Sequence, residues 1–177
     1  MRIATLFCGV ALLLTVSVAP ADATIINLYA NIDGAQETPP VATPATGTAT
    51  LTYDDVSNLL SWTISYSGLL GTTNNAHFHG PAAVGVGPAG VRLAIPFNTG
   101  VTADTLIGSG TISEAFEVEL LSQLWYINIH STSFGGGEIR GQVIPEPGTF
   151  ALTALGFLAL AVRRRVRPGR SASPMST

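Results

Sequence analysis

The sequence predicts an all-β domain, an antiparallel β-sandwich, between an N-terminal signal peptide and a C-terminal transmembrane helix. Two observations favour this organisation. Short segments in the middle of the chain alternate apolar and polar residues with the period of two that is typical of half-buried strands. The 177 residues are 46% hydrophobic but only 11% charged, whereas soluble proteins are about 25% charged. Both ends of the chain are more apolar than its middle.

The N-terminal end, residues 1–23, has the pattern of a secretory signal peptide. Arg2 precedes a mostly apolar run that a proline ends. Ala21 and Ala23 form the small-x-small pattern that signal peptidase accepts, so we expect cleavage after Ala23. The alternative is a retained anchor, but the run is short for a span of about 20 residues. Cys8, the single cysteine, would leave with the signal, and the mature chain could then form no disulfide or thiolate ligand.

The middle of the chain, residues 24–144, is expected to form the β-domain. Residues 60–67 alternate large apolar side chains with serine or threonine and are the clearest strand. Residues 46–53 alternate as well, and residues 54–58 have the composition of a turn, so the two strands are expected to form a hairpin. Further strands are expected over 25–31, 76–79, 91–95, 106–112, 124–130 and 138–144. This number of short strands with turns between them is typical of a sandwich.

Three segments of this domain are not clear strands. Residues 113–123 alternate apolar residues as a strand does, whereas three glutamates after Ser113 suit a short helix. Residues 36–46 contain three prolines and are expected to form an ordered, extended arm or an edge. Residues 80–90 are expected to be a loop, because their formal G-x-G-x-x-G match lacks the strand–helix context of a nucleotide site.

Three histidines are the candidates for chemistry. His77 and His79 stand two positions apart on a predicted strand and therefore share a face, and His130 ends another predicted strand. A His-x-His pair with a third histidine suits Zn or Cu, and Glu138 or Asn128 could be a fourth ligand or could orient a ligand. The alternative is structural: the imidazoles hydrogen-bond the glycine-rich loop and fasten it to the sheet.

The charged residues exclude several function classes. The chain has eight arginines and no lysine, which excludes lysine Schiff-base chemistry and a P-loop. Residues 24–144 hold two arginines and nine acidic residues, a net charge of −7. An acidic domain repels phosphate backbones, so no nucleic-acid partner is expected. We interpret Arg140, next but one to Glu138, as part of a local ion pair or as a clamp on a loop.

The C-terminal end, residues 145–170, combines three features. Pro145-Glu146-Pro147 ends the domain, residues 148–162 are uncharged and mostly apolar, and arginines crowd residues 163–170. A helix over 148–162 would be about 22 Å long at 1.5 Å per residue, which is short for a hydrocarbon core of about 30 Å. Arginines at its end can snorkel and hold that end on the cytoplasmic side. We therefore expect a transmembrane helix here.

This end resembles the PEP-CTERM sorting signal of Gram-negative bacteria. The resemblance rests on residues 143–149 (VIPEPGT), the apolar run and the arginine cluster. It implies export, a transient stay in the inner membrane, and processing by an exosortase near the Pro-Glu-Pro motif. The chain departs from the pattern by continuing after the arginines, with residues 171–177 as a tail.

Three blocks of the middle resemble a CHRD domain, the module first named in chordin. They are DGAQETPPVATPATGTA (33–49), AHFHGPA (76–82), and NIHS with GGEIRGQ (128–142). The resemblance implies an extracellular β module with no settled activity. A weaker likeness to Cu/Zn superoxide dismutase lies in the His-x-His strand, the later strand that ends in histidine and the glycine-rich loop. It implies a Greek-key sandwich, superoxide-dismutase-like or immunoglobulin-like, but the chain lacks the disulfide cysteines and the full set of metal ligands.

Two hypotheses for function follow. The first is an exported, non-catalytic surface or extracellular-matrix protein whose CHRD module binds exopolysaccharide or other surface proteins. Its processing enzymes would be signal peptidase and an exosortase. The alternative is a Cu or Zn protein, redox-active with copper, built on His77, His79 and His130.

Overall fold

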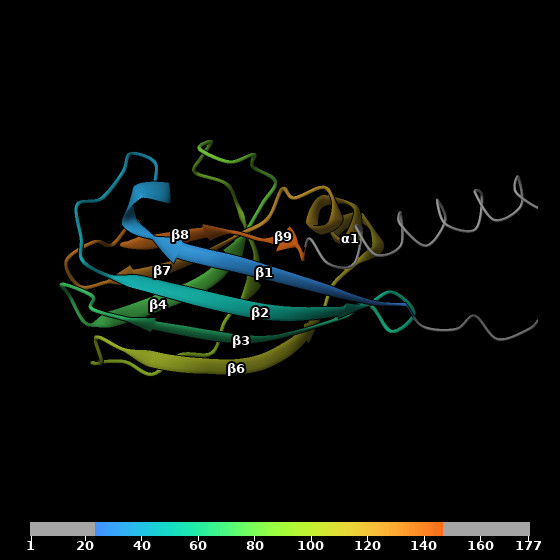
Figure 1. The fold of residues 1–177 in the computed structure, drawn as a ribbon, viewed down its shortest axis with the longest axis horizontal. Coiled ribbons are helices and arrows are strands. Elements are labelled where there is room, and N and C mark those ends of the chain that lie inside the picture. The colour runs from blue at the N-terminus through green and yellow to red at the C-terminus, as the bar shows by residue number, and fades with distance from the viewer. Residues whose placement is uncertain (1–23, 147–177) are drawn as a thin grey trace, which may run out of the picture.

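Nine strands, a short 3₁₀ turn and one α-helix make up residues 24–146, the part of the chain that the computed structural model describes (Figure 1). In chain order the elements are β1 (Ile25–Asp33), the 3₁₀ turn (Gly34–Gln36), β2 (Thr46–Asp54), β3 (Leu59–Ser67), β4 (Thr73–His79), β5 (Val91–Ala94), β6 (Asp104–Thr111), α1 (Glu114–Leu121), β7 (Tyr126–Ser131), β8 (Ile139–Gln142) and β9 (Ile144–Pro145). The expected signal peptide, with Ala21 and Ala23, and the expected transmembrane helix over 148–162 lie outside these residues. Within 24–146, no helix has the length and apolar character needed to cross a membrane.

The strands pair antiparallel throughout, which confirms the prediction of an all-β antiparallel domain. Their order is β5-β4-β7-β8-β1-β2-β3-β6, and β9 also pairs with β1. The strands therefore belong to one continuous hydrogen-bonded sheet, where the sequence led us to expect two separate sheets. The predicted hairpin is β2–β3, paired over the whole length of both strands.

The sheet curls until its two edge strands, β5 and β6, lie in side-chain contact, and this makes it a nearly closed barrel with two facing layers. In Figure 1, β1, β2, β3 and β6 cross in front of β4 and β7. A Cβ added at Gly110 of β6 would come within 3.0 Å of the Leu93 side chain of β5. Closing a sheet in this way protects edge strands from pairing with other chains.

The core lies between the two layers and follows from the alternation in the sequence. On β3, Leu60, Trp62, Ile64 and Tyr66 point inward and are buried, while the serines and Thr63 face outward. Trp62 of β3 packs edge-on against Phe78 of β4, with ring centroids 5.1 Å apart. Phe78 also contacts Trp125, which is fully buried. Aromatic side chains thus join the front layer to the back layer.

The ambiguous segment 113–123 is helical. The Ser113 hydroxyl accepts a hydrogen bond from the backbone N–H of Phe116, which caps the first turn of α1. Leu120 is fully buried, whereas Val118 is 67% exposed. The two residues are two positions apart and would share one face of a strand, whereas in a helix they face different directions, as observed.

The last predicted strand, 138–144, is divided at Val143. Here the backbone N–H of Val143 donates to the carbonyl of Trp125, and the Val143 side chain is fully buried. The chain then returns to β1 as β9, where Ile144 lies opposite Tyr29. β8 and β9 pair with β1 in the same register, so the two short strands continue one another on either side of Val143.

Candidate metal centre

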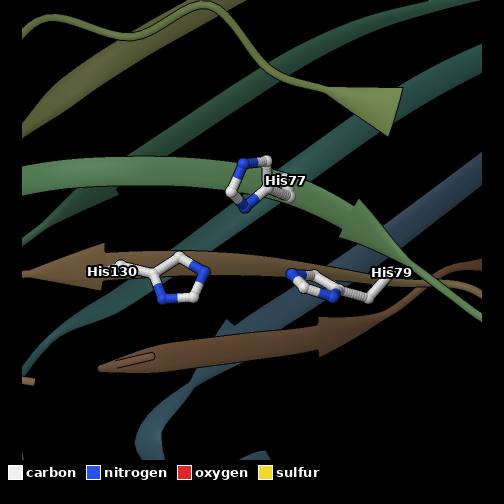
Figure 2. Close-up of side chains that lie close together, drawn as sticks. All are labelled: His77, His79 and His130. Carbon is white, nitrogen blue, oxygen red and sulfur yellow. The ribbon is translucent and has the colours of Figure 1, made fainter. Parts of the chain in front are cut away.

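The predicted His-x-His strand exists as β4. His77 and His79 are half-buried on one of its faces, while Ala76 and Phe78 are fully buried on the other. The adjacent strand β7 places Asn128 directly opposite His77. His130 is two residues beyond Asn128 on the same face of β7. The pairing of β4 with β7 therefore brings the third histidine to the first two (Figure 2).

The three imidazoles converge on one point. The ring centroid of His77 lies 5.5 Å from those of His79 and His130, and the His79 and His130 centroids are 6.0 Å apart. One nitrogen from each ring can be chosen so that all three nitrogens lie within 4.8 Å of one another. Figure 2 shows the rings grouped over the two strands. Around a tetrahedral ion with Zn–N distances of about 2.0–2.1 Å, ligand nitrogens lie about 3.4 Å apart, so the three rings would draw closer together on binding one ion.

Two of the rings are held by backbone carbonyls. Nδ1 of His79 lies 2.9 Å from the carbonyl oxygen of Ala89, and Nδ1 of His130 lies 3.0 Å from that of Gly135. A carbonyl can only accept, so Nδ1 carries the hydrogen in both rings and Nε2 carries the lone pair. Both Nε2 atoms are buried without a partner, and so is Nδ1 of His77. Metal-binding histidines typically have this arrangement, with one nitrogen donating to a carbonyl and the other free to ligate.

The surroundings keep the three rings neutral. Burial lowers the pKa of His77, and the neighbouring His130 and His79 lower it further. Burial also lowers the pKa of His79 and of His130, although the hydrogen bonds to the carbonyls oppose it. Neutral imidazole is the form that binds a metal.

An aromatic and cationic stack supports the site from one side. The ring of Tyr126 is stacked on His79, with centroids 5.2 Å apart and an angle of 9° between the planes. The guanidinium carbon of Arg140 lies 3.5 Å from the centroid of the Tyr126 ring. Arg140 also donates to the carbonyl of Val86, and the Tyr126 hydroxyl accepts from the N–H of Ala89. Arg140 therefore fastens the loop 80–90 to the sheet, which is one of the two roles suggested from the sequence.

The other suggested role, an Arg140–Glu138 ion pair, is wrong. The ion pair found within residues 24–146 joins Arg92 to Glu119. Glu138 is fully buried and accepts hydrogen bonds from two hydroxyls and two backbone N–H groups, those of Thr43, Ser131, Leu70 and Gly71. Burial alone would raise its pKa, but these four bonds together lower it. The oxygens of Glu138 are thus occupied away from the histidines and do not supply a fourth ligand.

Asn128 and a residue that sequence reasoning missed, Glu37, form a buried polar pair beside the site. Asn128 is 4% exposed and Glu37 is 6% exposed, and Asn128 Nδ2 lies 3.5 Å from a Glu37 oxygen. Oε1 of Glu37 and Oδ1 of Asn128 have no hydrogen-bond partner. Burial raises the pKa of Glu37 from 4.5 to about 7, against the opposing charge of Arg140. The sequence marked Glu37 only as one residue of the first CHRD-like block.

Two family models match the chain. The family model of the CHRD domain matches residues 28–143, well over half of the chain. The model of the PEP-CTERM protein-sorting motif matches residues 143–165 and includes Pro145, Glu146 and Pro147. No curated protein and no solved structure matches the chain. The sorting motif implies export, processing by an exosortase and transient residence in a membrane on the way to the cell surface. The chain belongs to the CHRD domain family and carries a PEP-CTERM sorting signal.

Proposed function

We propose that this exported protein binds one Zn or Cu ion through His77, His79 and His130. The observation that carries the proposal is the set of three unpartnered buried nitrogens, one from each ring, that face one another across β4 and β7. The ligating atoms would be Nδ1 of His77 and Nε2 of His79 and His130, because the carbonyls of Ala89 and Gly135 engage the other nitrogens of the last two rings.

The donor set indicates which metals suit the site. Imidazole binds Zn and Cu well, whereas Mg and Ca prefer oxygen ligands. Residues 24–146 contain no cysteine and no methionine, so soft sulfur donors do not contribute from this domain. Three protein ligands leave a position for a water molecule or an external ligand. The amide oxygen of Asn128, on the same face of β7, is the candidate for orienting that ligand.

Metal analysis of the purified protein tests this proposal. We expect close to one Zn or Cu per chain after loading and dialysis, and less than about 0.1 in a His77→Ala/His79→Ala variant. Asn74→Ala is the matched control, because Asn74 is exposed on the same strand, is not paired with His130 and offers no imidazole; this variant is expected to keep its metal. Less than about 0.1 metal per wild-type chain would refute the proposal.

We propose secondly that the domain is a non-catalytic binding module for exopolysaccharide or other surface proteins in the extracellular matrix. The outward faces of β2 and β3 support this, because they carry an uncharged array of hydroxyl groups: Thr48, Thr50, Thr52, Ser61, Thr63 and Ser65. Such groups can hydrogen-bond a neutral glycan. The test is cosedimentation of the purified protein with isolated exopolysaccharide. A Thr50→Val/Thr63→Val variant should bind more weakly than the wild-type protein, and no cosedimentation of the wild-type protein would refute this role.

A further inference from the structure

The folded domain contains the beginning of its own sorting motif. Ile144 and Pro145 form β9, which pairs with β1 opposite Tyr29 and Leu28. The next residue, Glu146, donates its backbone N–H to the carbonyl of Asn27, at 3.1 Å. Glu146 is half-buried. Two of the three residues of the Pro-Glu-Pro motif are therefore hydrogen-bonded or packed against the first strand of the domain.

No linker separates the CHRD domain from the sorting motif. The CHRD match ends at Val143, and the match to the sorting motif begins at the same residue. Val143 is fully buried and its N–H is bonded to Trp125, so the point from which the motif extends is fixed to the core. Val143 directly precedes Ile144, so this fixed residue holds β9 beside β1.

We propose that the pairing of β9 with β1 is a gate on the processing of this protein: the exosortase gains access to the motif only when β9 has detached from β1. The proposal rests on the sorting signal and is independent of the metal centre. A peptidase binds its substrate as an extended segment whose backbone is free to pair with the enzyme. A segment that is already paired within a sheet is therefore cleaved only in those molecules in which it has detached from its neighbour.

The structure indicates that β9 can detach from β1 at low cost. β9 has two residues, and one of them, Pro145, has no N–H to contribute to the ladder. Its side chains are half-buried, whereas the adjoining β8 is buried along its whole length. The short strand can therefore detach while β8 and the core stay intact. The folded domain then lowers the rate of processing without preventing it.

A disulfide lock is the first test. Tyr29 and Ile144 are directly opposed, and opposed residues of antiparallel strands have Cα atoms about 4.5–5.5 Å apart, within the range of a disulfide. The Tyr29→Cys/Ile144→Cys variant of the full chain is oxidised in membranes that contain the host exosortase, and processing is followed by mass spectrometry. We expect at least about tenfold slower processing of the crosslinked form, with recovery after reduction. The two single substitutions, Tyr29→Cys and Ile144→Cys, are the matched controls and should be processed at the wild-type rate; all variants carry Cys8→Ser, so that no other cysteine is present.

A spacer is the second test and acts in the opposite direction. A flexible Gly-Ser segment inserted between Val143 and Ile144 keeps Pro145-Glu146-Pro147 intact but separates these residues from the fixed Val143. We expect processing to become at least about threefold faster. The same segment inserted between Thr99 and Gly100, in an exposed turn, is the control and should change nothing. The proposal would be overturned if the crosslinked chain were processed at the wild-type rate, or if the spacer variant were processed no faster than the wild-type chain. It would also be overturned if the wild-type chain were never shortened.

Discussion

Replacing Glu37 by glutamine is expected to stabilise the domain at alkaline pH. The carboxyl group is 6% exposed and two of the buried oxygens around it, its own Oε1 and Oδ1 of Asn128, have no partner. Burial raises its pKa to about 7, and the positive charge of Arg140 opposes this rise without cancelling it. The fold therefore favours the protonated carboxyl. Glutamine keeps the shape of this group, carries no charge, and offers an N–H that Asn128 can accept.

The sign and size of the effect follow from the two pKa values. Because the folded pKa is raised, the stability contributed by Glu37 is fully present below pH 4.5 and is lost as the pH rises through about 7. The difference between 4.5 and about 7 corresponds to a loss of about 3 kcal/mol at high pH. We expect Glu37→Gln to remove this loss. The variant should then gain up to about 3 kcal/mol over the wild-type protein between pH 5 and pH 8.5.

Urea unfolding of both proteins across this pH range measures the gain. The lowered pKa values of His77, His79 and His130 act in the opposite direction, since neutral histidines are lost as the pH falls. These histidines are present in both proteins, so the difference in the free energy of unfolding isolates Glu37. Glu114→Gln, at an exposed position of α1, is the control. The reasoning would be refuted if the free energies of unfolding of Glu37→Gln and of the wild-type protein differed by the same amount at pH 5 and at pH 8.5.

Two further substitutions test the buried polar groups. Glu138→Gln should lower the free energy of unfolding by about 3 kcal/mol, because its amide group must face the N–H of Leu70 or Gly71 in either orientation; a loss below about 1 kcal/mol in urea unfolding would contradict this. Gly137→Ala should lower the melting temperature by several degrees, because the new Cβ would collide with Asn128 and Gly137 has a φ of 127°. Gly136→Ala, which meets nothing within 4 Å, should not do so.

Local patterns predicted the strands well because burial on a sheet alternates. The alternation of residues 60–67 corresponds to β3, and the choice between strand and helix at 113–123 was decided by the Ser113 cap, which the sequence does show. The closure of the sheet could not be predicted in the same way. It depends on β6 pairing with β3 and on β1 pairing with β8 and β9 as well as with β2. These are long-range pairings, and no local period encodes them.

The candidate site was predictable where it depends on a single strand and not where it depends on loops. His77 and His79 share a face because they are two residues apart, and this holds in any register. The carbonyls of Ala89 and Gly135 could not be predicted, since every residue has a carbonyl and only the loop conformation selects these two. Glu37 was missed for a similar reason: an acidic residue in a proline-rich arm gives no sign that it will be buried.

The two hypotheses for the histidines are compatible, because each imidazole has two nitrogens. The bond from Nδ1 of His79 to Ala89 confirms the structural hypothesis for this ring, because Ala89 lies in the glycine-rich loop 80–90. His130 instead bonds Gly135, in the loop between β7 and β8. A structural role does not explain why the opposite nitrogens of the same rings are buried without partners, at a cost of about 1–3 kcal/mol each. His77 separates the hypotheses most sharply, because its buried Nδ1 has no partner in either loop and faces the other two rings. One bound metal ion would satisfy all three nitrogens, whereas loop fastening would satisfy none of them.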